Sequence, residues 1–456
     1  MDKIYNFICF IYKLFPPLQH LKTNNHQNKQ NMKKNQFLLL SLFLGTVIFS
    51  SCEKNLYDED KLPEKDHTVA NLNIPSNFNW KMTKNAECTV TTTNNTPISV
   101  YLDKSCSESE LVASFTTNSE NAPLSLSLPS YVNELYFQYE TSDGQKKVIS
   151  ASLNGNGNIN IALPSNTRAM VQTRDNNDIK TDQSDVVYYP KNGWGTIMFE
   201  DLFPGLGDYD FNDFVMNYKV QLYEVEKTGN GNNKNYTTKA MQIGARLKAM
   251  GGSLDYRPYL RIHGLKRADI SSISLHESFN TKITEVKLIE GKNGETIIDL
   301  SELTDNLHKP AGSHYYNTEK EYAISSDKLP QINIYIELKE PVIIKGNLED
   351  EDFEFYLAHE NGTEIHLSGY EPVAYKYPID NKNILPLDGN IANYYYSVDR
   401  LIWGLKVPDD VAQAIEKANF LDAYKNFEKW ATSGGQNDSN WYGQGNSNKD
   451  LLMPLN

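Results

Sequence analysis

The sequence predicts an all-β protein, with an N-terminal immunoglobulin-like β-sandwich followed by a larger, jelly-roll-like β-sandwich domain that carries a C-terminal helix. Short apolar runs separated by Thr, Asn, Ser and Gly turns recur along most of the chain, which is typical of strands. Only one stretch, near the C-terminus, has apolar residues at helical spacing. The 456 residues are 39% hydrophobic and 22% charged, as in globular proteins, and suit two or three domains.

The net charge limits the class of partner. The chain has 44 Lys and Arg against 58 Asp and Glu, a formal charge of -14. Nucleic-acid binding relies on clustered Lys and Arg that neutralise phosphates. The composition therefore argues against nucleic acid as a partner.

The N-terminus resembles a bacterial lipoprotein signal. Residues 32–51 combine Lys33 and Lys34 with a short apolar run, and small residues precede Cys52, as in the sites where a lipoprotein cysteine is cleaved and acylated. We expect Cys52 to be lipidated and to hold the protein at a membrane. Residues 1–31 precede a complete signal, so we interpret them as an over-extension of the start site.

Residues 52–72 are polar and are expected to form a tether. The acidic segment at residues 53–60 resembles the export signal of surface lipoproteins in Bacteroidota. The expected location is the outer membrane, lipid-anchored, at the cell surface.

Residues 73–165 contain strand-like runs every 10–13 residues, as expected for the immunoglobulin-like sandwich. Cys88 and Cys106 fall within it, and outside the cytoplasm they are expected to form a disulfide, with two free thiols as the alternative. Residues 166–184 are polar without periodicity and are interpreted as a linker.

Residues 185–456 are predicted to form one large β-rich domain. Its helix is expected after Pro408, where Asp409 and Asp410 suit a helix N-terminus and apolar residues recur as far as Trp430. Asn419 is a possible break between two shorter helices.

The densest chemistry lies between residues 200 and 213. Six oxygen-bearing side chains fall within 14 residues, namely Glu200, Asp201, Asp208, Asp210, Asn212 and Asp213. Carboxylates this close repel one another unless a cation screens them, and Ca²⁺ prefers hard oxygen ligands. A Ca²⁺ site in a loop between strands is favoured. The alternatives are a turn in which these side chains cap backbone N–H groups and a catalytic carboxylate pair.

The same motif carries a family resemblance. Residues 207–220, GDYDFNDFVMNYKV, resemble the signature of LruC-domain lipoproteins, as do EIHLSGYEP at 364–372 and LIWGLKVP at 401–408. A closing FEKWATSGG followed by WY, within 427–442, is also similar. The resemblance implies that residues 185–456 form an LruC-type β-sandwich domain of a lipoprotein with no assigned activity.

Taken together, these features predict a cell-envelope lipoprotein with a non-catalytic binding or adhesion role and a Ca²⁺ cofactor. No catalytic residues are expected, since the sequence lacks a nucleophile elbow and a zinc-type histidine pair. The partners expected are a membrane, through the lipid, and a glycan or protein ligand. Two alternatives are open: an enzyme that acts on glycans with the same carboxylates, and a structural component of a surface assembly with an exposed strand edge.

Overall fold

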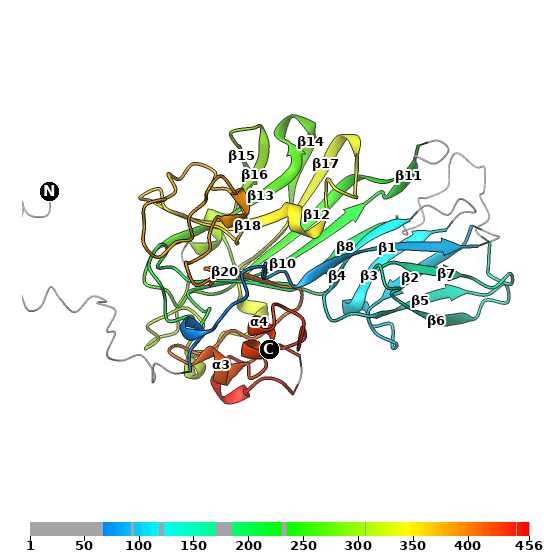
Figure 1. Cartoon of the computed structure of the whole chain (residues 1–456). Helices are drawn as coiled ribbons and strands as arrows, with labels where there is room; N and C mark the ends of the chain where they lie inside the picture. Colours follow the sequence, from blue (N-terminus) through cyan, green and yellow to red (C-terminus); the bar gives the residue numbers. More distant parts are fainter. Residues whose placement is uncertain are drawn as a thin grey trace, which may run out of the picture. The chain divides into compact units, whose positions relative to one another are not determined.

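The computed structural model describes residues 67–92, 95–117, 123–169, 185–229, 235–305, 307–443 and 445–455, and is nearly all β (Figure 1). The N-terminal part has seven strands: β1 (Thr83–Thr91), β2 (Pro97–Tyr101), β3 (Leu111–Thr116), β4 (Leu124–Pro129), β5 (Glu134–Glu140), β6 (Lys146–Ser152) and β7 (Ile159–Ala162). β4, β1 and β7 form a three-stranded sheet, whereas β3, β2, β5 and β6 are consecutive in a larger sheet. This arrangement confirms the predicted sandwich of two sheets.

The larger sheet continues beyond residue 165. Its further strands are β8 (Val186–Tyr189), β9 (Gly195–Phe199), β10 (Phe214–Tyr223), β11 (Glu226–Thr228), β12 (Asn235–Ala249), β14 (Ile270–Phe279), β17 (Gln331–Ile343) and β20 (Gly404–Val407). The main path runs β14-β17-β12-β10-β8-β3-β2-β5-β6. The junction is the antiparallel pairing of β3 with β8, in which Ala113 lies opposite Val187. One sheet therefore crosses the position where we placed the boundary between two domains.

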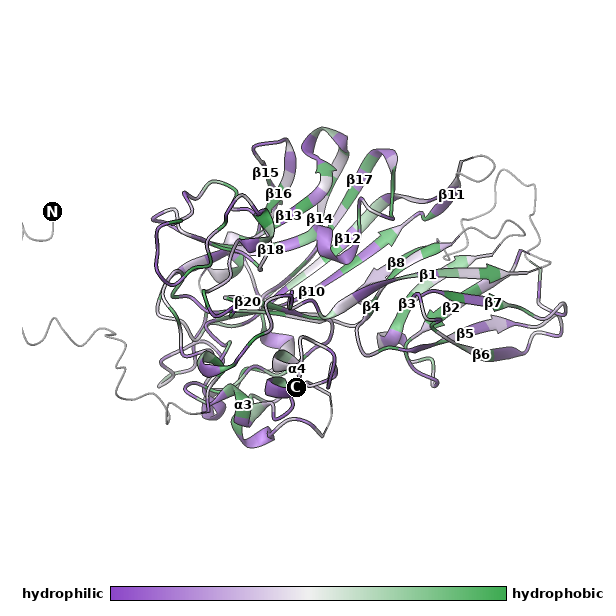
Figure 2. Ribbon diagram, viewed as in Figure 1, coloured by the Kyte–Doolittle hydropathy of each residue, from purple (hydrophilic) through white to green (hydrophobic). Residues whose placement is uncertain are grey.

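A third sheet packs against this one and has the order β15-β16-β13-β18-β19. Its strands are β13 (Tyr256–Lys266), β15 (Lys287–Glu290), β16 (Glu295–Asp299), β18 (Phe353–His359) and β19 (Glu364–Ile365). Hydrophobic and hydrophilic positions alternate along many strands (Figure 2), because successive side chains of a strand point to opposite faces. Ile334 and Ile336 of β17, for example, are fully buried in the main core together with Leu260 of β13.

A second core, which we call the C-terminal aromatic cluster, joins the two ends of the described chain. It contains the helices α3 (Phe420–Ala423) and α4 (Phe427–Thr432), with Trp430 1% exposed. Phe78 and Trp80, just before β1, pack edge-on against Trp430 with ring centroids 5.1 and 5.7 Å away. In Figure 1 the blue segment that precedes β1 lies beside these red helices.

The helical prediction after Pro408 is wrong for residues 409–418, which are not helical. Asp409 and Asp410 bind cations of the sheet instead of capping a helix: Asp409 pairs with Lys191, and Asp410 with Lys248 and Arg246. The predicted break at Asn419 is also wrong, since no helix precedes this residue: Asn419 is the N-cap of α3, where its side chain accepts a hydrogen bond from the Leu421 N–H, and residues 424–426 separate α3 from α4.

The predicted Cys88–Cys106 disulfide is not formed, and both cysteines are free thiols. Cys88 is buried on β1 in the three-stranded sheet, whereas Cys106 follows β2 of the other sheet and lies beside the Lys104 carbonyl. Burial raises the pKa of the Cys88 thiol to about 12. The two side chains therefore belong to different layers.

Several predictions fall wholly or partly outside the described residues: the over-extension at 1–31, the signal at 32–51, Cys52, most of the tether and most of the linker. The last residues of the expected tether are described, and there Val69 and Leu72 are buried in the C-terminal aromatic cluster. Among the described residues, no helix combines the length and apolarity that a membrane crossing needs.

Candidate metal centre between strands β9 and β10

The acidic residues form the connection between two paired strands. β9 and β10 are antiparallel, with Phe199 opposite Phe214, so residues 200–213 are a loop closed at its base by the sheet. The Asp201 N–H donates to Asp213 Oδ2 at 2.8 Å and extends this closure by one step. We call residues 200–213 the acidic loop.

Glu200 organises the loop from inside. It is fully buried, and its two carboxylate oxygens accept hydrogen bonds from the N–H groups of Tyr209 (3.0 Å) and Phe211 (2.7 Å). Both of these residues have left-handed backbones, with φ of 57° and 53°. Such a conformation costs roughly 1–2 kcal/mol in a residue other than glycine. Burial of both rings in the C-terminal aromatic cluster, with Phe211 5.1 Å from Phe420, offsets this cost.

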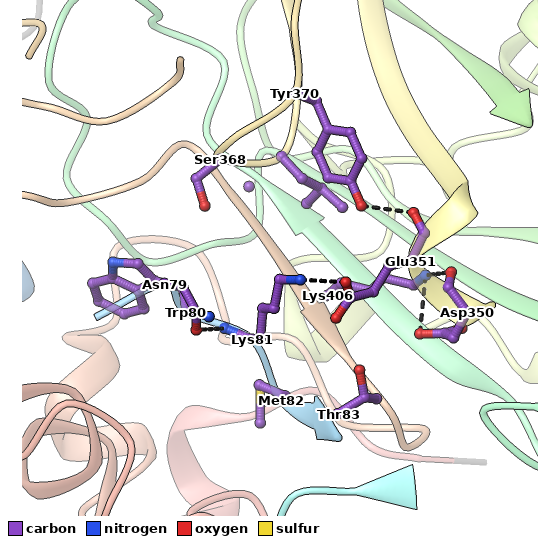
Figure 3. Close-up of a pocket in the computed structure, with 12 residues that line it drawn as sticks. Asn79, Trp80, Lys81, Met82, Thr83, Asp350, Glu351, Ser368, Tyr370 and Lys406 are labelled. Carbon is purple, nitrogen blue, oxygen red and sulfur yellow. Dashed lines mark hydrogen bonds and ion pairs between the residues drawn. The ribbon is translucent and has the colours of Figure 1, made fainter. Parts of the chain in front are cut away.

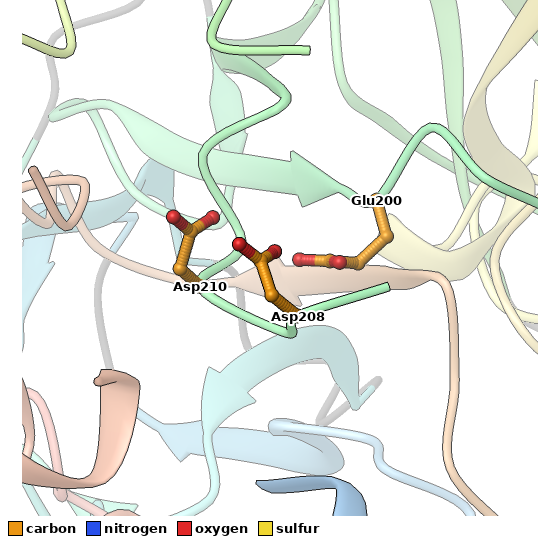
Figure 4. A group of neighbouring side chains, drawn as sticks. All are labelled: Glu200, Asp208 and Asp210. Atoms are coloured by element: carbon orange, nitrogen blue, oxygen red, sulfur yellow. The ribbon is translucent and has the colours of Figure 1, made fainter. Parts of the chain in front are cut away.

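The alternation in the sequence DYDFND follows from this geometry. The side chains of Tyr209 and Phe211 point into the C-terminal aromatic cluster, whereas those of Asp208 and Asp210 lie close to Glu200. Ligand oxygens of Glu200, Asp208 and Asp210 lie within 4.8 Å of one another. Figure 4 shows the three carboxylates gathered in one place, with Asp208 between the other two. Asp208 is exposed to solvent, whereas Glu200 and Asp210 are buried.

The other three predicted ligands lie beside this group. Asp201 Oδ2 accepts the Leu254 N–H at 2.9 Å, which ties the loop to the segment after β12. Asn212 donates from Nδ2 to Asp210 Oδ2 at 2.7 Å. Asp213 is occupied by the Asp201 N–H described above. The structure therefore brings together three of the six residues as one group, and uses Asp201, Asn212 and Asp213 to hold the loop in shape.

Sequence reasoning missed a further acid. Glu416 lies near Asp208, whose charge, after desolvation, raises the pKa of the Glu416 carboxyl to about 7. The next residue, Lys417, has φ of 64° and donates its N–H to Asp210 Oδ2 at 3.1 Å. Glu416 stands about 200 residues away in the sequence, in a stretch that we read as a helix, so no local signal marked it.

The electrostatics of the loop favour a cation. Burial raises the pKa of the Glu200 carboxyl well above its usual range, and the charges of Asp213, Asp208 and Asp210 raise it further. Desolvation and then Asp208 act in the same direction on the pKa of Asp210. Desolvation also raises the pKa of Asp208, and the charge of Lys417 only partly opposes the rise at Asp208 and Glu416. A bound cation would favour the ionised form of these carboxyls, because metal binding competes with protons for the same oxygens.

The size of the group suits Ca²⁺. Oxygens bound to one Ca²⁺ at about 2.3–2.6 Å lie at most roughly 5 Å apart. The 4.8 Å spread of the Glu200, Asp208 and Asp210 oxygens meets this limit. All donors are oxygens, which calcium prefers and zinc in structural sites does not.

Two hollows lie on the surface of the described residues. One, of about 60 Å³, is lined by Trp80, Ser368 and Tyr370 and crossed by the Lys81–Glu351 ion pair (Figure 3). At its side, Lys406 pairs with the buried Asp350 at 3.1 Å. The second, of about 410 Å³, is lined by residues that follow β12 and by residues 304–316. Only the second adjoins the acidic loop, through Gly252 and Leu254.

A separate buried charge cluster lies between β13, β18 and β19. His366 is fully buried and stacks on Tyr356, with ring centroids 4.4 Å apart. Its Nδ1 contacts Glu354, and its Nε2 lies 3.0 Å from Glu364 Oε2. Because ionised carboxylates only accept hydrogen bonds, both ring nitrogens must donate, and His366 is an imidazolium. Arg261 completes the cluster by donating to Glu354 at 2.7 Å.

Comparison with known proteins gives a fold and a domain. A crystal structure of a Bacteroides ovatus protein named as a candidate lipoprotein is similar to this chain at 19% identity, with a TM-score of 0.62; the match covers 79% of this chain and 100% of that one. BcpA, the major pilin subunit of Bacillus cereus, matches at 10% identity over 62% of this chain and 66% of that one, but its TM-score of 0.13 supports no argument. No curated protein matches.

The family model described as "Domain of unknown function (DUF4842)" matches residues 237–442, from β12 to Tyr442 of the C-terminal aromatic cluster. The match includes Glu416 and Lys417, whereas the acidic loop precedes it. The relationship to LruC-domain lipoproteins stays a prediction. Residues 237–442 of this all-β chain thus match the DUF4842 model, and the chain has a fold similar to that of the Bacteroides ovatus protein.

Proposed function

We propose that this protein is a lipid-anchored protein of the cell envelope, displayed on the outer membrane, with a non-catalytic binding or adhesion role and a Ca²⁺ ion that organises the acidic loop. The observation that carries the metal is the convergence of the Glu200, Asp208 and Asp210 oxygens within 4.8 Å. The lipoprotein signal before Cys52 and the name of the structural neighbour support the envelope location.

One feature favours a bound ion over a pure capping network. Capping accounts for Glu200 and Asp201, which accept backbone N–H groups, and the backbone N–H of Asp210 also acts on the Asp208 carboxylate. Glu416, however, reaches the cluster from a distant segment, although like charges repel one another. A cation explains why two segments bring acids together.

The buried position of the acids also favours binding over catalysis. Glu200 is 0% exposed and Asp210 2% exposed, and backbone N–H groups already occupy oxygens of both. A general acid or base must reach the proton that it transfers. We therefore assign the cluster a structural, metal-binding role.

The test is calorimetric titration of residues 53–456 with Ca²⁺, beside thermal melts in Ca²⁺ and in EDTA. A ligand that binds only the folded state raises stability, by about 2.7 kcal/mol at one hundred times its Kd. We expect binding heat and a higher Tm in Ca²⁺. Absence of both would contradict the metal and leave the capping network.

Asp210→Ala should lower the Tm measured in Ca²⁺ far more than the Tm measured in EDTA, because it removes a ligand. The matched control is Asp143→Ala, which removes an exposed aspartate from the turn between β5 and β6 and should leave the Ca²⁺ response intact. Equal losses in Ca²⁺ and EDTA for Asp210→Ala would show that Asp210 acts only through hydrogen bonds.

The anchor has its own test. Cys52→Ala should abolish acylation and leave an uncleaved precursor, which mass spectrometry and metabolic labelling with a fatty acid would detect. Normal acylation of this variant would contradict the lipoprotein assignment. Protease treatment of intact cells distinguishes the two faces of the outer membrane: a protein on the cell surface is degraded, and one on the inner face is protected.

A further inference from the structure

The groove of about 410 Å³ has walls of mixed chemistry. One wall is the turn after β12, with Ser253, Leu254 and Asp255, and the other is the loop that carries His314 and Tyr315. Tyr315 is half-buried, and the side chain of His314 is 81% exposed. The volume is large enough for a small ligand rather than for a few waters.

The groove and the acidic loop share their framework. The Gly252 N–H donates to the Asp213 carbonyl at 3.0 Å, and the Leu254 N–H donates to Asp201 Oδ2 at 2.9 Å. A Cβ at Gly252 would overlap the Asp201 carboxylate, so glycine allows this close approach. The wall at 252–255 is therefore positioned by Asp201 and Asp213, two residues that hold the acidic loop in shape.

The opposite wall is held by one carboxylate. Glu319 Oε2 accepts hydrogen bonds from Ser313 Oγ and the His314 N–H, both at 2.7 Å. Glu319 Oε1 lies 3.1 Å from His314 Nδ1, which fixes the ring. These hydrogen bonds, that of Ser313 first, lower the pKa of Glu319 to about 2, so it stays ionised. Because these hydrogen bonds already order the loop, it loses little conformational entropy when a ligand binds.

Its free groups define the ligand chemistry. The Nε2 of His314 and the hydroxyl of Tyr315 have no hydrogen-bond partner among the residues that the structure describes. The cation of the groove, Lys309, already donates to the His314 carbonyl at 3.1 Å. Asp255 and the nearby acidic loop repel anions, and the polar walls do not suit a lipid.

We propose that this groove binds a neutral glycan, with the Tyr315 ring stacking on a sugar face and His314 and Asp255 hydrogen-bonding its hydroxyls. This proposal deepens the proposed function and rests on it in one respect: Ca²⁺ orders the wall at 252–255, so glycan binding should need Ca²⁺. The sugar contacts themselves belong to groups outside the acidic loop.

The test is binding of residues 53–456 to an array of immobilised neutral gluco-, manno-, xylo- and galacto-oligosaccharides, with sialylated and uronic-acid oligosaccharides alongside. We expect retention on neutral oligosaccharides in Ca²⁺ and at least a tenfold loss in EDTA. Tyr315→Ala and His314→Ala should each lose at least tenfold. His308→Ala makes the same change in the same loop outside the groove lining and should bind as the wild type does.

Thermal melts separate the two proposals. If Tyr315→Ala keeps the Tm rise in Ca²⁺ but loses the neutral oligosaccharide, the groove is supported and misfolding is excluded. If Ca²⁺ raises the Tm but no neutral oligosaccharide binds, or binding survives both substitutions, the groove proposal is overturned and the metal stands. Binding that survives EDTA and still needs Tyr315 supports the groove and contradicts the metal. Retention on acidic oligosaccharides alone overturns the assignment of a neutral ligand.

Discussion

At the scale of single residues, two buried clusters of opposite character show how neighbours set a charge. In the acidic loop, like charges and burial raise the pKa values of Glu200 and Asp210. Around His366, burial alone would lower the pKa of the imidazole, but Glu354 and Glu364 raise it above its usual value. The acids of the first cluster outnumber its cation, Lys417, whereas in the second cluster His366, Arg261 and His263 contact Glu354. The proposed metal therefore belongs to the first cluster.

The His366 cluster predicts a loss of stability at alkaline pH. A group whose pKa is raised in the folded state contributes stability that is complete below its unfolded pKa and is lost as pH rises through its folded pKa. We expect the free energy of unfolding, measured with urea, to fall above the ordinary histidine range. His366→Gln should remove this slope. It should also cost about 3–5 kcal/mol near neutral pH, because it removes the cation from the buried Glu364 and leaves Glu354 with Arg261 and His263. An unchanged alkaline slope would contradict the assignment.

At acidic pH the free energy of unfolding depends on pH in the opposite direction. The pKa of Glu354 is lowered to about 2 by His366, the hydrogen bond with His263, and Arg261, despite its burial. Its contribution is present above the ordinary carboxylate range and is lost as pH falls toward 2.

At the scale of elements, the acidic loop depends on a glycine. A Cβ at Gly207 would overlap Glu200 Oε2, within the group that closes the loop. We expect Gly207→Ala to lower the Tm and to weaken the response to Ca²⁺. Gly155→Ala is the control, since nothing lies within 4 Å of a Cβ there. If both variants had the same Tm and the same response to Ca²⁺, Glu200 would be able to move without a loss of stability or of metal binding.

The segment before β1 provides a second prediction. Trp80 is 4% exposed, and its Nε1 donates to the Arg400 carbonyl at 2.9 Å. Trp80→Ala should destabilise the protein by about 3–5 kcal/mol, as large-to-small changes in a core do. Trp194→Ala should cost less, because Trp194 is only half-buried, with Lys219 and Arg246 over its ring. Urea unfolding of both variants compares them, and similar losses would contradict a core role for Trp80.

At the scale of the whole molecule, the continuous sheet predicts one cooperative unit. Because β8 pairs with β3 and residues 69–82 pack in the C-terminal aromatic cluster, residues 185–456 alone would lose partners on two sides. Differential scanning calorimetry of residues 53–456 should give one main transition, and residues 185–456 alone should not fold stably. Two well-separated transitions, or a stable fragment, would contradict this expectation.

Apolar runs and turn residues predict most strands, because a strand buries at least one of its faces, as β5 does, or both, as β4 and β9 do. They could not predict that β3 and β8 pair, since pairing depends on residues far apart in the sequence. The helix was over-predicted because Asp409 and Asp410 have strong partners in Lys191 and Lys248, which only the fold brings near. The acidic loop was visible in the sequence because its ligands are neighbours, whereas Glu416 and the groove come from separate segments.

The docking of Phe78 and Trp80 also has a mechanical consequence. The chain enters the described fold at His67, whose carbonyl accepts a hydrogen bond from the Asn419 side chain at 2.7 Å. A pulling force applied through the N-terminus would therefore reach the C-terminal aromatic cluster before it reaches Thr83, the first residue of β1. The rings of Phe78 and Trp80 would have to leave the C-terminal aromatic cluster before β1 could separate from its sheet. Because Tyr209 and Phe211 of the acidic loop pack in the same cluster, such a force would act on the acidic loop before it acts on β1.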